Sequence, residues 1–228
     1  MRIIIFIIVC SQISNWAYSQ VNENDRIVFP KSIIADTGTV KPSCFEILKI
    51  DQKIPSIFLY DSLGHKIKTD SLFKNNKPVV FINGSYSCFV FRGNVKRINN
   101  FINKNKDKYT IYFVYVQEAH PITCSPYGTM NENVPKNSKK GINLEQPIFF
   151  IDRLIYAKKT VKDFKIQVPL LIDNEFNDYF TSVFAGPNGY LVFSPEKKLI
   201  EQRRWFHNRQ YERNKRKFER HHKMPKSH

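Results

Sequence analysis

Short apolar runs alternate with segments of helical periodicity along the middle of the chain. Residues 79–83, 112–116 and 168–173 are apolar enough for strands that are buried on both faces. Apolar residues recur at helical spacing over 91–102 and again over 145–164, with polar residues between them. The pattern therefore predicts two long helices, each lying between two buried strands.

Hairpins flank this alternating region at both ends. Residues 54–67 predict two short strands joined by a turn, and 190–193 with 199–200 predict a second hairpin. Short helical segments are expected over 70–73 and 176–184. Strands that alternate with helices before an antiparallel pair indicate an α/β fold, with a mixed central sheet flanked by helices on both faces.

One long polar segment interrupts the pattern. Residues 121–143 contain three prolines and two glycines, so a surface loop is expected there. Loops of this length are often functional.

The first residues follow the order of a secretory signal. Met1 and Arg2 precede an apolar run over 3–9, and polar and small residues follow it up to Gln20. The run falls short of the roughly 20 residues that cross a bilayer. We therefore expect a signal peptide over 1–19 and an exported protein, either periplasmic or secreted.

The rest of the chain divides by composition into three parts. A polar lead covers 20–50, the alternating region covers 51–202, and a basic C-terminal helix or tail covers 203–228. The tail holds half of the formal net charge of +16. The tail either forms a solvated helix or contacts an anionic surface. Nucleic acid is not an expected partner, because an exported protein rarely meets it.

Cys88 is the strongest candidate for chemistry. It follows the turn at Ser85 and directly precedes the first long helix, where backbone N–H groups and the helix dipole stabilise a thiolate. The alternative is a buried, inert cysteine. Glu118 and His120 follow the strand at 112–116, and open α/β sheets bind ligands at such strand ends. They could manage protons there, or they could be loop residues that face solvent.

Removal of the signal would leave three cysteines, Cys44, Cys88 and Cys124. Phe91 stands where a Cys-x-x-Cys partner would be, so Cys124, or Cys44, is the candidate that resolves an oxidised Cys88. Without either, Cys88 needs an external thiol reductant or a thioredoxin-like electron donor. The cysteines are too widely separated to indicate a metal site, and the chemistry requires no cofactor.

The element order, together with Pro187 before the last hairpin, resembles the thioredoxin-like redoxins over about residues 54–200. Within this stretch, segments 83–91 and 115–121 are similar to the active-site segment and the Glu-Ala-His segment of the iodothyronine deiodinases. The resemblance implies that Cys88 takes the place of the catalytic selenocysteine and Ser87 that of the adjoining hydroxyl residue.

The same resemblance implies that Glu118 and His120 lie beside the site and that a cis peptide bond precedes Pro187. Departures from the family matter, because Phe89 and Val90 replace a proline pair and the residues after His120 differ. No thyroid hormone pocket is implied.

These observations predict an exported thiol-dependent oxidoreductase that acts on a disulfide, a peroxide or a halogenated aromatic compound. The alternative is a noncatalytic thioredoxin-fold module that binds an acidic partner.

Overall fold

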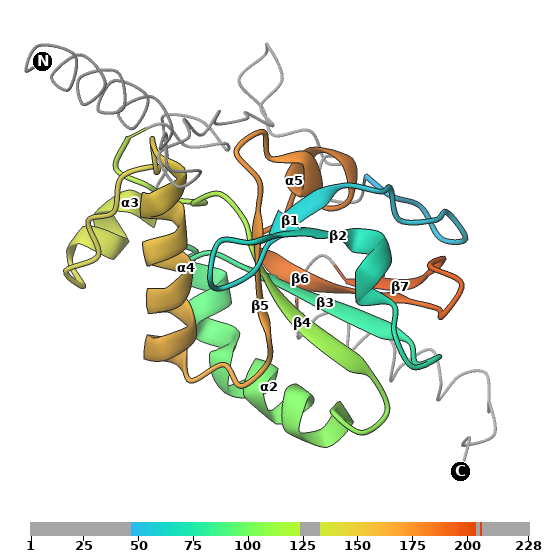
Figure 1. The fold of residues 1–228 in the computed structure, drawn as a ribbon. Helices are drawn as coiled ribbons and strands as arrows, with labels where there is room; N and C mark the ends of the chain where they lie inside the picture. The colour runs from blue at the N-terminus through green and yellow to red at the C-terminus, as the bar shows by residue number, and fades with distance from the viewer. Residues whose placement is uncertain (1–46, 124–132, 204–205, 207–228) are drawn as a thin grey trace, which may run out of the picture.

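A computed structural model describes residues 47–123, 133–203 and 206. The expected signal peptide, Cys44, Cys124 and nearly all of the basic tail lie outside these ranges. Seven strands of the described chain form one sheet, in the order β2-β1-β5-β4-β3-β6-β7 (Figure 1). They are β1 (Phe58–Tyr60), β2 (Lys66–Lys68), β3 (Val79–Gly84), β4 (Thr110–Tyr115), β5 (Leu170–Asp173), β6 (Asn188–Phe193) and β7 (Leu199–Arg203).

The sheet is mixed, as the sequence predicts. Strands β3, β4 and β5 run parallel, whereas β1 and β6 pair with β5 and β3 in the antiparallel sense. The two expected hairpins are present as β1–β2 and β6–β7. In the pairing of β3 with β6, Gly84 lies opposite Asn188, so β6 begins beside the end of β3.

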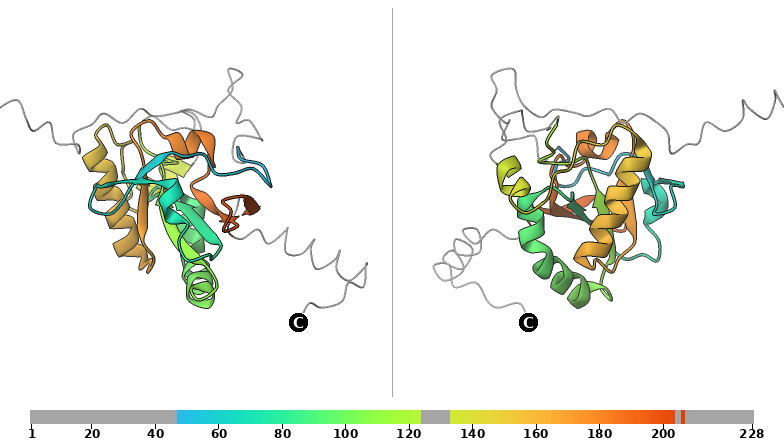
Figure 2. Two further views of the ribbon diagram at one scale, coloured as in Figure 1. Left: turned by 45° about the vertical axis from the view of Figure 1, so that its right-hand side comes forward. Right: turned by 90° about the vertical axis from the view of Figure 1, so that its left-hand side faces the viewer.

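Helices cover both faces of the sheet. The helical segments are a 3₁₀ turn η3 (Thr69–Leu72), α2 (Phe89–Asn105), α3 (Asn133–Ser138), α4 (Phe150–Phe164) and α5 (Asp178–Ser182). Helices α2 and α4 pack side by side on one face (Figure 2), where their apolar residues join a core with Val80, Ile82 and Phe113. Helix α5 and the 3₁₀ turn cover the opposite face, over Phe81 and Leu191.

Two elements differ from the sequence prediction. Helix α4 begins at Phe150 rather than near residue 145, because Gln146 precedes a proline, which disfavours helical backbone, and its side chain binds the backbone of Glu118. Helix α3 lies within the segment that was expected to be a loop, and it admits Pro135 in its first turn, where a missing N–H costs no helical hydrogen bond.

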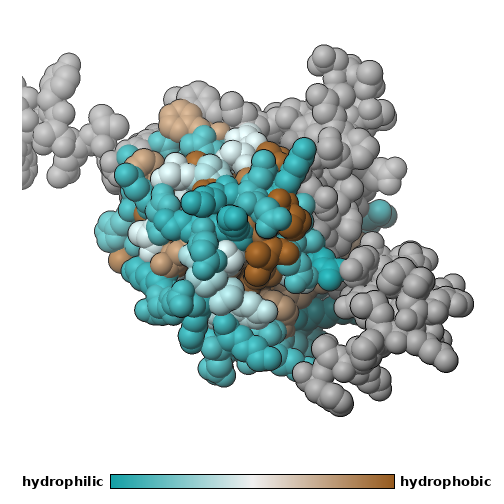
Figure 3. All heavy atoms as spheres, turned by 90° about the vertical axis from the view of Figure 1, so that its right-hand side faces the viewer, coloured by the Kyte–Doolittle hydropathy of each residue, from teal (hydrophilic) through white to brown (hydrophobic). Residues whose placement is uncertain are grey.

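The described surface carries mostly hydrophilic side chains. On the side of the molecule that lies at the right in Figure 1, hydrophobic groups occur as small patches among polar ones (Figure 3). Within the described ranges, no helix is both long and apolar enough to cross a bilayer.

Candidate functional site

Cys88 is the N-cap residue of α2. Its backbone is extended, and its Sγ accepts a hydrogen bond from the backbone N–H of Phe91 at 3.4 Å. Its own N–H donates to the carbonyl oxygen of Ser85 at 3.3 Å, which closes the turn that connects β3 to the helix. The position that the sequence predicts for the thiol, after a buried strand and at the start of a long helix, is confirmed.

Burial changes the acidity of this thiol in the opposite direction from the helix. Cys88 is only 2% exposed. Burial raises the pKa of its thiol to about 12, and the charge of Glu118 also raises it. The N–H groups of Phe91 and Val90 and the charge of Arg92 lower it by less. The lowered pKa that the helix start alone predicts is therefore wrong, because desolvation of the thiolate outweighs the effect of the helix.

Glu118 is a buried acid of the site and not a solvent-facing loop charge. Its carboxylate accepts the backbone N–H groups of Tyr86 at 3.1 Å and Ser87 at 2.6 Å, the Ser87 hydroxyl, and the Tyr115 hydroxyl. Burial raises the pKa of Glu118, while these donors and the charge of Arg92 oppose the shift. The carboxyl thus binds the backbone of the turn that carries Cys88.

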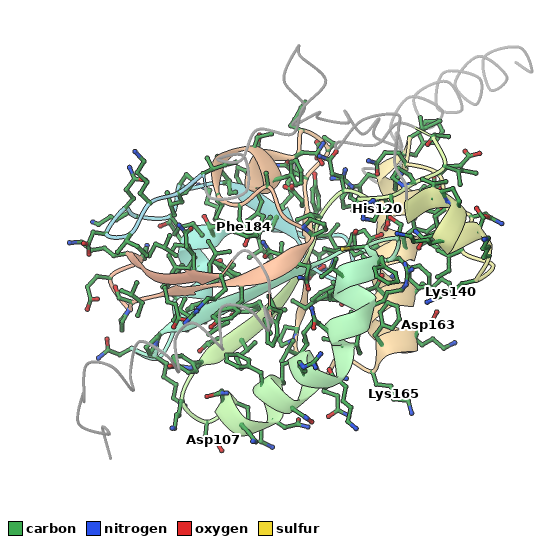
Figure 4. The ribbon with its side chains drawn as sticks, turned by 180° about the vertical axis from the view of Figure 1, so that it is seen from behind. Asp107, His120, Lys140, Asp163, Lys165 and Phe184 are labelled. Atoms are coloured by element: carbon green, nitrogen blue, oxygen red, sulfur yellow. The ribbon has the colours of Figure 1, made fainter. Side chains whose placement is uncertain are left out.

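Two buried serines join the same turn to the segment after β4. The Ser85 hydroxyl oxygen accepts the N–H of Ala119 at 3.3 Å, and that of Ser87 accepts the N–H of His120 at 2.9 Å. Figure 4 shows His120 at the end of the molecule where α2 begins. The structure therefore brings Ser85, Ser87, Cys88, Glu118 and the backbone of His120 into one site.

Arg92 and Asn137 complete this site, although the sequence does not single them out. The Arg92 guanidinium donates to the Tyr86 carbonyl oxygen at 2.7 Å and to the Asn137 Oδ1 at 2.5 Å. The Asn137 amide donates to the Ser87 carbonyl oxygen at 2.8 Å. Spacing of four residues from Cys88 could have pointed to Arg92, since it lies one turn along the same helix. Asn137 gives no such signal, because it comes from α3.

The other predicted residues do not join this hydrogen-bonded group. The peptide bond before Pro187 is trans, so the cis bond implied by the family resemblance is wrong. The trans form of such a bond is favoured by about 0.5–1 kcal/mol unless the surroundings select the other. Cys44 and Cys124 lie outside the described residues, and Cys88 is a free thiol.

A second buried polar cluster lies at the end of β5. The Arg153 guanidinium donates to the carbonyl oxygens of Asp173 and Asn174 and to the Asn177 Oδ1. The Asp173 carboxylate accepts two backbone N–H groups of α5, those of Tyr179 and Phe180. Burial raises the pKa of Asp173 to about 6 and lowers that of Arg153 to about 10. This cluster ties α4, β5 and α5 together beside the site.

Within the described residues there is no metal cluster, and one pocket lies away from Cys88. No group of three or more potential metal-ligating side chains occurs among the residues that the structure describes. An open pocket of about 170 Å³ lies beside Asn99, Asn103 and Lys165. Asn99 is ten residues from the start of α2, or about 15 Å along the helix, so this pocket is separate from the thiol.

Comparison with known proteins gives fold-level likenesses. No protein-family model and no curated protein match the sequence. The solution structure of a Bacteroides thetaiotaomicron protein, provisionally described as a protein disulfide isomerase, matches 78% of this chain and 96% of its own, with 15% identity and a TM-score of 0.49. The thioredoxin domain of a thiol-disulfide oxidoreductase from Bacteroides vulgatus matches 75% of this chain and 98% of its own, with 15% identity and a TM-score of 0.44.

These likenesses concern the fold alone. The chain's own strand order, with a helix after β3 and an antiparallel hairpin at the end, gives the mixed α/β sheet of the thioredoxin-like class that the sequence predicts. The chemistry has to be argued from the site.

Proposed function

We propose that the protein is a thiol-dependent oxidoreductase in which Cys88 is the nucleophile. The observation that carries this proposal is the pairing of a helix-capping thiol with a fully buried carboxyl in one hydrogen-bonded site. Burial raises the pKa of Glu118, so its carboxylate is a better proton acceptor than that of an exposed acid. The pair therefore offers a sulfur nucleophile and a group that takes up its proton.

Proton transfer between the two groups makes the site reactive. In the resting state Cys88 holds the proton and Glu118 carries the charge that disfavours the thiolate. When the proton moves to Glu118, the thiolate forms and that repulsion disappears. The sulfur then attacks one sulfur of a disulfide, the S–S bond breaks, and the leaving thiolate takes the proton from Glu118. His120 could exchange this proton with solvent.

The mixed disulfide on Cys88 must then be reduced. A thiol, either external or that of Cys124 or Cys44, attacks the Cys88 sulfur, so the remaining half of the substrate leaves as a thiol and a new disulfide to Cys88 forms. External thiol attack on that disulfide then frees Cys88 and ends in a disulfide between two external thiols. A second thiol becomes oxidised in the same step sequence, so each turnover converts two thiols into one disulfide. A thioredoxin-like donor or a low-molecular-weight thiol is the expected partner.

The resemblance to the iodothyronine deiodinases suggests a narrower reaction. There the Cys88 sulfur would bond to the halogen, the carbon–halogen bond would break, and the carbon would take up a proton. A thiol would then attack the Cys88 sulfur and release halide, and a second thiol would free Cys88 from the disulfide that results. We also propose that the protein is exported and that its basic tail contacts an anionic surface. The segments concerned, residues 1–46 and 207–228, lie outside the described structure.

The proposal is tested by turnover with dithiothreitol as the reductant and a small disulfide, hydrogen peroxide or an iodinated aromatic compound as the substrate. We expect reduction of at least one of them, with a loss of at least about a hundredfold in Cys88→Ser, because a hydroxyl does not replace a thiolate nucleophile. Asn103→Ala, on the surface of α2 far from the thiol, is the matched control. Full activity of Cys88→Ser on the active substrate would refute the proposal.

A noncatalytic binding module is the second candidate. It is favoured by one observation, the nearly complete burial of Cys88 with a pKa of about 12. In that case Cys88 would resist iodoacetamide in the folded protein at every pH below unfolding, and none of the three substrates would be reduced. Reaction of Cys88 in the folded state would exclude this candidate.

A further inference from the structure

Arg92 places a positive charge at the turn that carries Cys88. Its backbone N–H donates to the carbonyl oxygen of Cys88 at 3.1 Å, so it lies one helical turn further along α2. Its side chain reaches back along the helix to the Tyr86 carbonyl oxygen at 2.7 Å, two residues before the thiol. The guanidinium therefore lies alongside residues 86–88.

Both oxygens that bind the guanidinium within the described chain are neutral. One is the Tyr86 carbonyl and the other is the amide oxygen of Asn137. A carboxylate in either place would pair with the guanidinium and cancel its field at the sulfur. An amide fixes the side chain and leaves its charge available.

Asn137 fixes both the cation and the turn. It is 1% exposed, and its two amide atoms bind different partners, the guanidinium of Arg92 and the Ser87 carbonyl oxygen. Lys140, which follows α3, lies over the ring of Phe89 with its Nζ 5.3 Å from the ring centre. The segment around α3 thus attaches to the start of α2 at two points.

We infer that Arg92 is the cation that stabilises the anionic sulfur of Cys88 and that Asn137 is the positioning residue that holds it there. The inference rests on the proposed function, since it concerns the charged form of the same thiol. Glu118 opposes the thiolate. The surrounding segments also carry the titratable groups Tyr86 with its partners Asp163 and Lys159, and Tyr115, His120, Lys136, Lys139 and Lys140. Arg92 is the cation whose charge acts in the thiolate's favour.

The inference is tested by the rate at which iodoacetamide alkylates Cys88, followed by peptide mass across pH. Only the thiolate reacts, and iodide leaves without a proton, so this rate reports the thiolate population. Loss of a nearby opposite charge shifts a pKa by about one unit or more, so Arg92→Gln is expected to react about tenfold more slowly at a given pH. Arg97→Gln, on the same helix with its side chain bonded to Asn94, is the matched control and keeps the original rate.

Charge-conserving and charge-cancelling variants separate electrostatics from packing. Arg92→Lys keeps the charge and is expected to restore most of the rate, although it lacks the planar guanidinium. Asn137→Asp places a carboxylate on Arg92 and removes the donor to the Ser87 carbonyl oxygen, so it is expected to slow alkylation at least as much as Arg92→Gln does. In addition, the ratio of the iodoacetate rate to the iodoacetamide rate should fall in Arg92→Gln and remain unchanged in Arg97→Gln.

The inference is overturned if Arg92→Gln reacts as fast as the unaltered chain, or if Arg92→Lys is as slow as Arg92→Gln. If circular dichroism shows that Arg92→Gln does not fold, the other two variants decide. Alkylation must then be faster in Arg92→Lys than in Asn137→Asp, and equal rates overturn the inference. Failure of the proposed function looks different. Turnover would survive Cys88→Ser, whatever the variants at Arg92 do to alkylation.

Discussion

At the scale of single residues, the site balances groups that oppose and favour the same thiolate. Burial and Glu118 raise the pKa of Cys88, whereas the N–H groups at the start of α2 and the charge of Arg92 lower it. Burial has the largest effect on this pKa, so the thiol is protonated near neutral pH. A reactive state therefore requires that Glu118 take up the proton or that solvent reach the sulfur.

Replacement of Glu118 by Gln separates the two effects of this carboxyl. Without its charge, the pKa of Cys88 should fall, so iodoacetamide should alkylate Cys88 several-fold faster. Reduction of a disulfide should become slower by at least about tenfold, because the leaving thiolate loses its proton donor. Glu145→Gln is the control, because it removes a carboxylate outside this hydrogen-bonded network. The neighbouring Gln146 is left unchanged, since its side chain binds the Glu118 backbone. Faster turnover in Glu118→Gln would contradict the donor role.

At the scale of elements, the junction between β3 and α2 depends on a close approach. A Cβ on Gly84 would lie 2.6 Å from ring atoms of both Phe91 and Phe113, whose rings stack on each other. Glycine at this position allows β3 to end directly under the first turn of α2. The site geometry thus depends on a residue that carries no functional group.

Two alanine substitutions test this junction. Gly84→Ala forces the two rings apart and should lower the free energy of unfolding by about 1–3 kcal/mol. Gly93→Ala, in the middle of α2 with open space around the position, should raise it by about 0.5–1 kcal/mol. Urea denaturation measures both values. Equal effects of the two substitutions would show that packing at Gly84 is not tight.

The sequence predicts the elements better than it predicts the site. Buried strands and amphipathic helices follow from periodicity, so β3, α2 and β4 lie where they are expected, and Cys88 and Glu118 lie at their ends. Burial of the thiol could not be predicted, because it depends on packing between distant segments. The contact of Asn137 with Ser87 joins residues that are fifty positions apart in the chain, and no local pattern indicates it.

At the scale of the whole molecule, buried charge links stability to pH. The folded state keeps a proton on Asp173 up to about pH 6, whereas its ordinary pKa is 3.8. Between about pH 4 and pH 6 this group therefore binds more protons in the folded state than in the unfolded state. Stability from this group is largest at low pH and falls as the pH rises, by at most about 1.4 kcal/mol per pH unit.

Asp173→Asn removes this titration. The difference in free energy of unfolding between the unaltered chain and Asp173→Asn should move in favour of the variant as the pH rises from about 4 to about 6, and should be constant above about pH 7. Urea denaturation at several pH values measures this difference. The contributions of other acids with shifted pKa values cancel in it, because both chains contain those acids. A difference that does not vary with pH would show that Asp173 titrates normally.

The central claim is that Cys88 attacks the substrate, and a trapped intermediate tests it most directly. A chain with Cys10→Ser, Cys44→Ser and Cys124→Ser keeps Cys88 alone and cannot resolve a mixed disulfide internally. One exposure to a small disulfide without reductant should therefore leave the adduct on Cys88. The account predicts about one adduct per chain by intact mass, located by peptide mass at Cys88 and released by dithiothreitol. An unmodified Cys88 in a folded chain that nevertheless consumes the disulfide would contradict it.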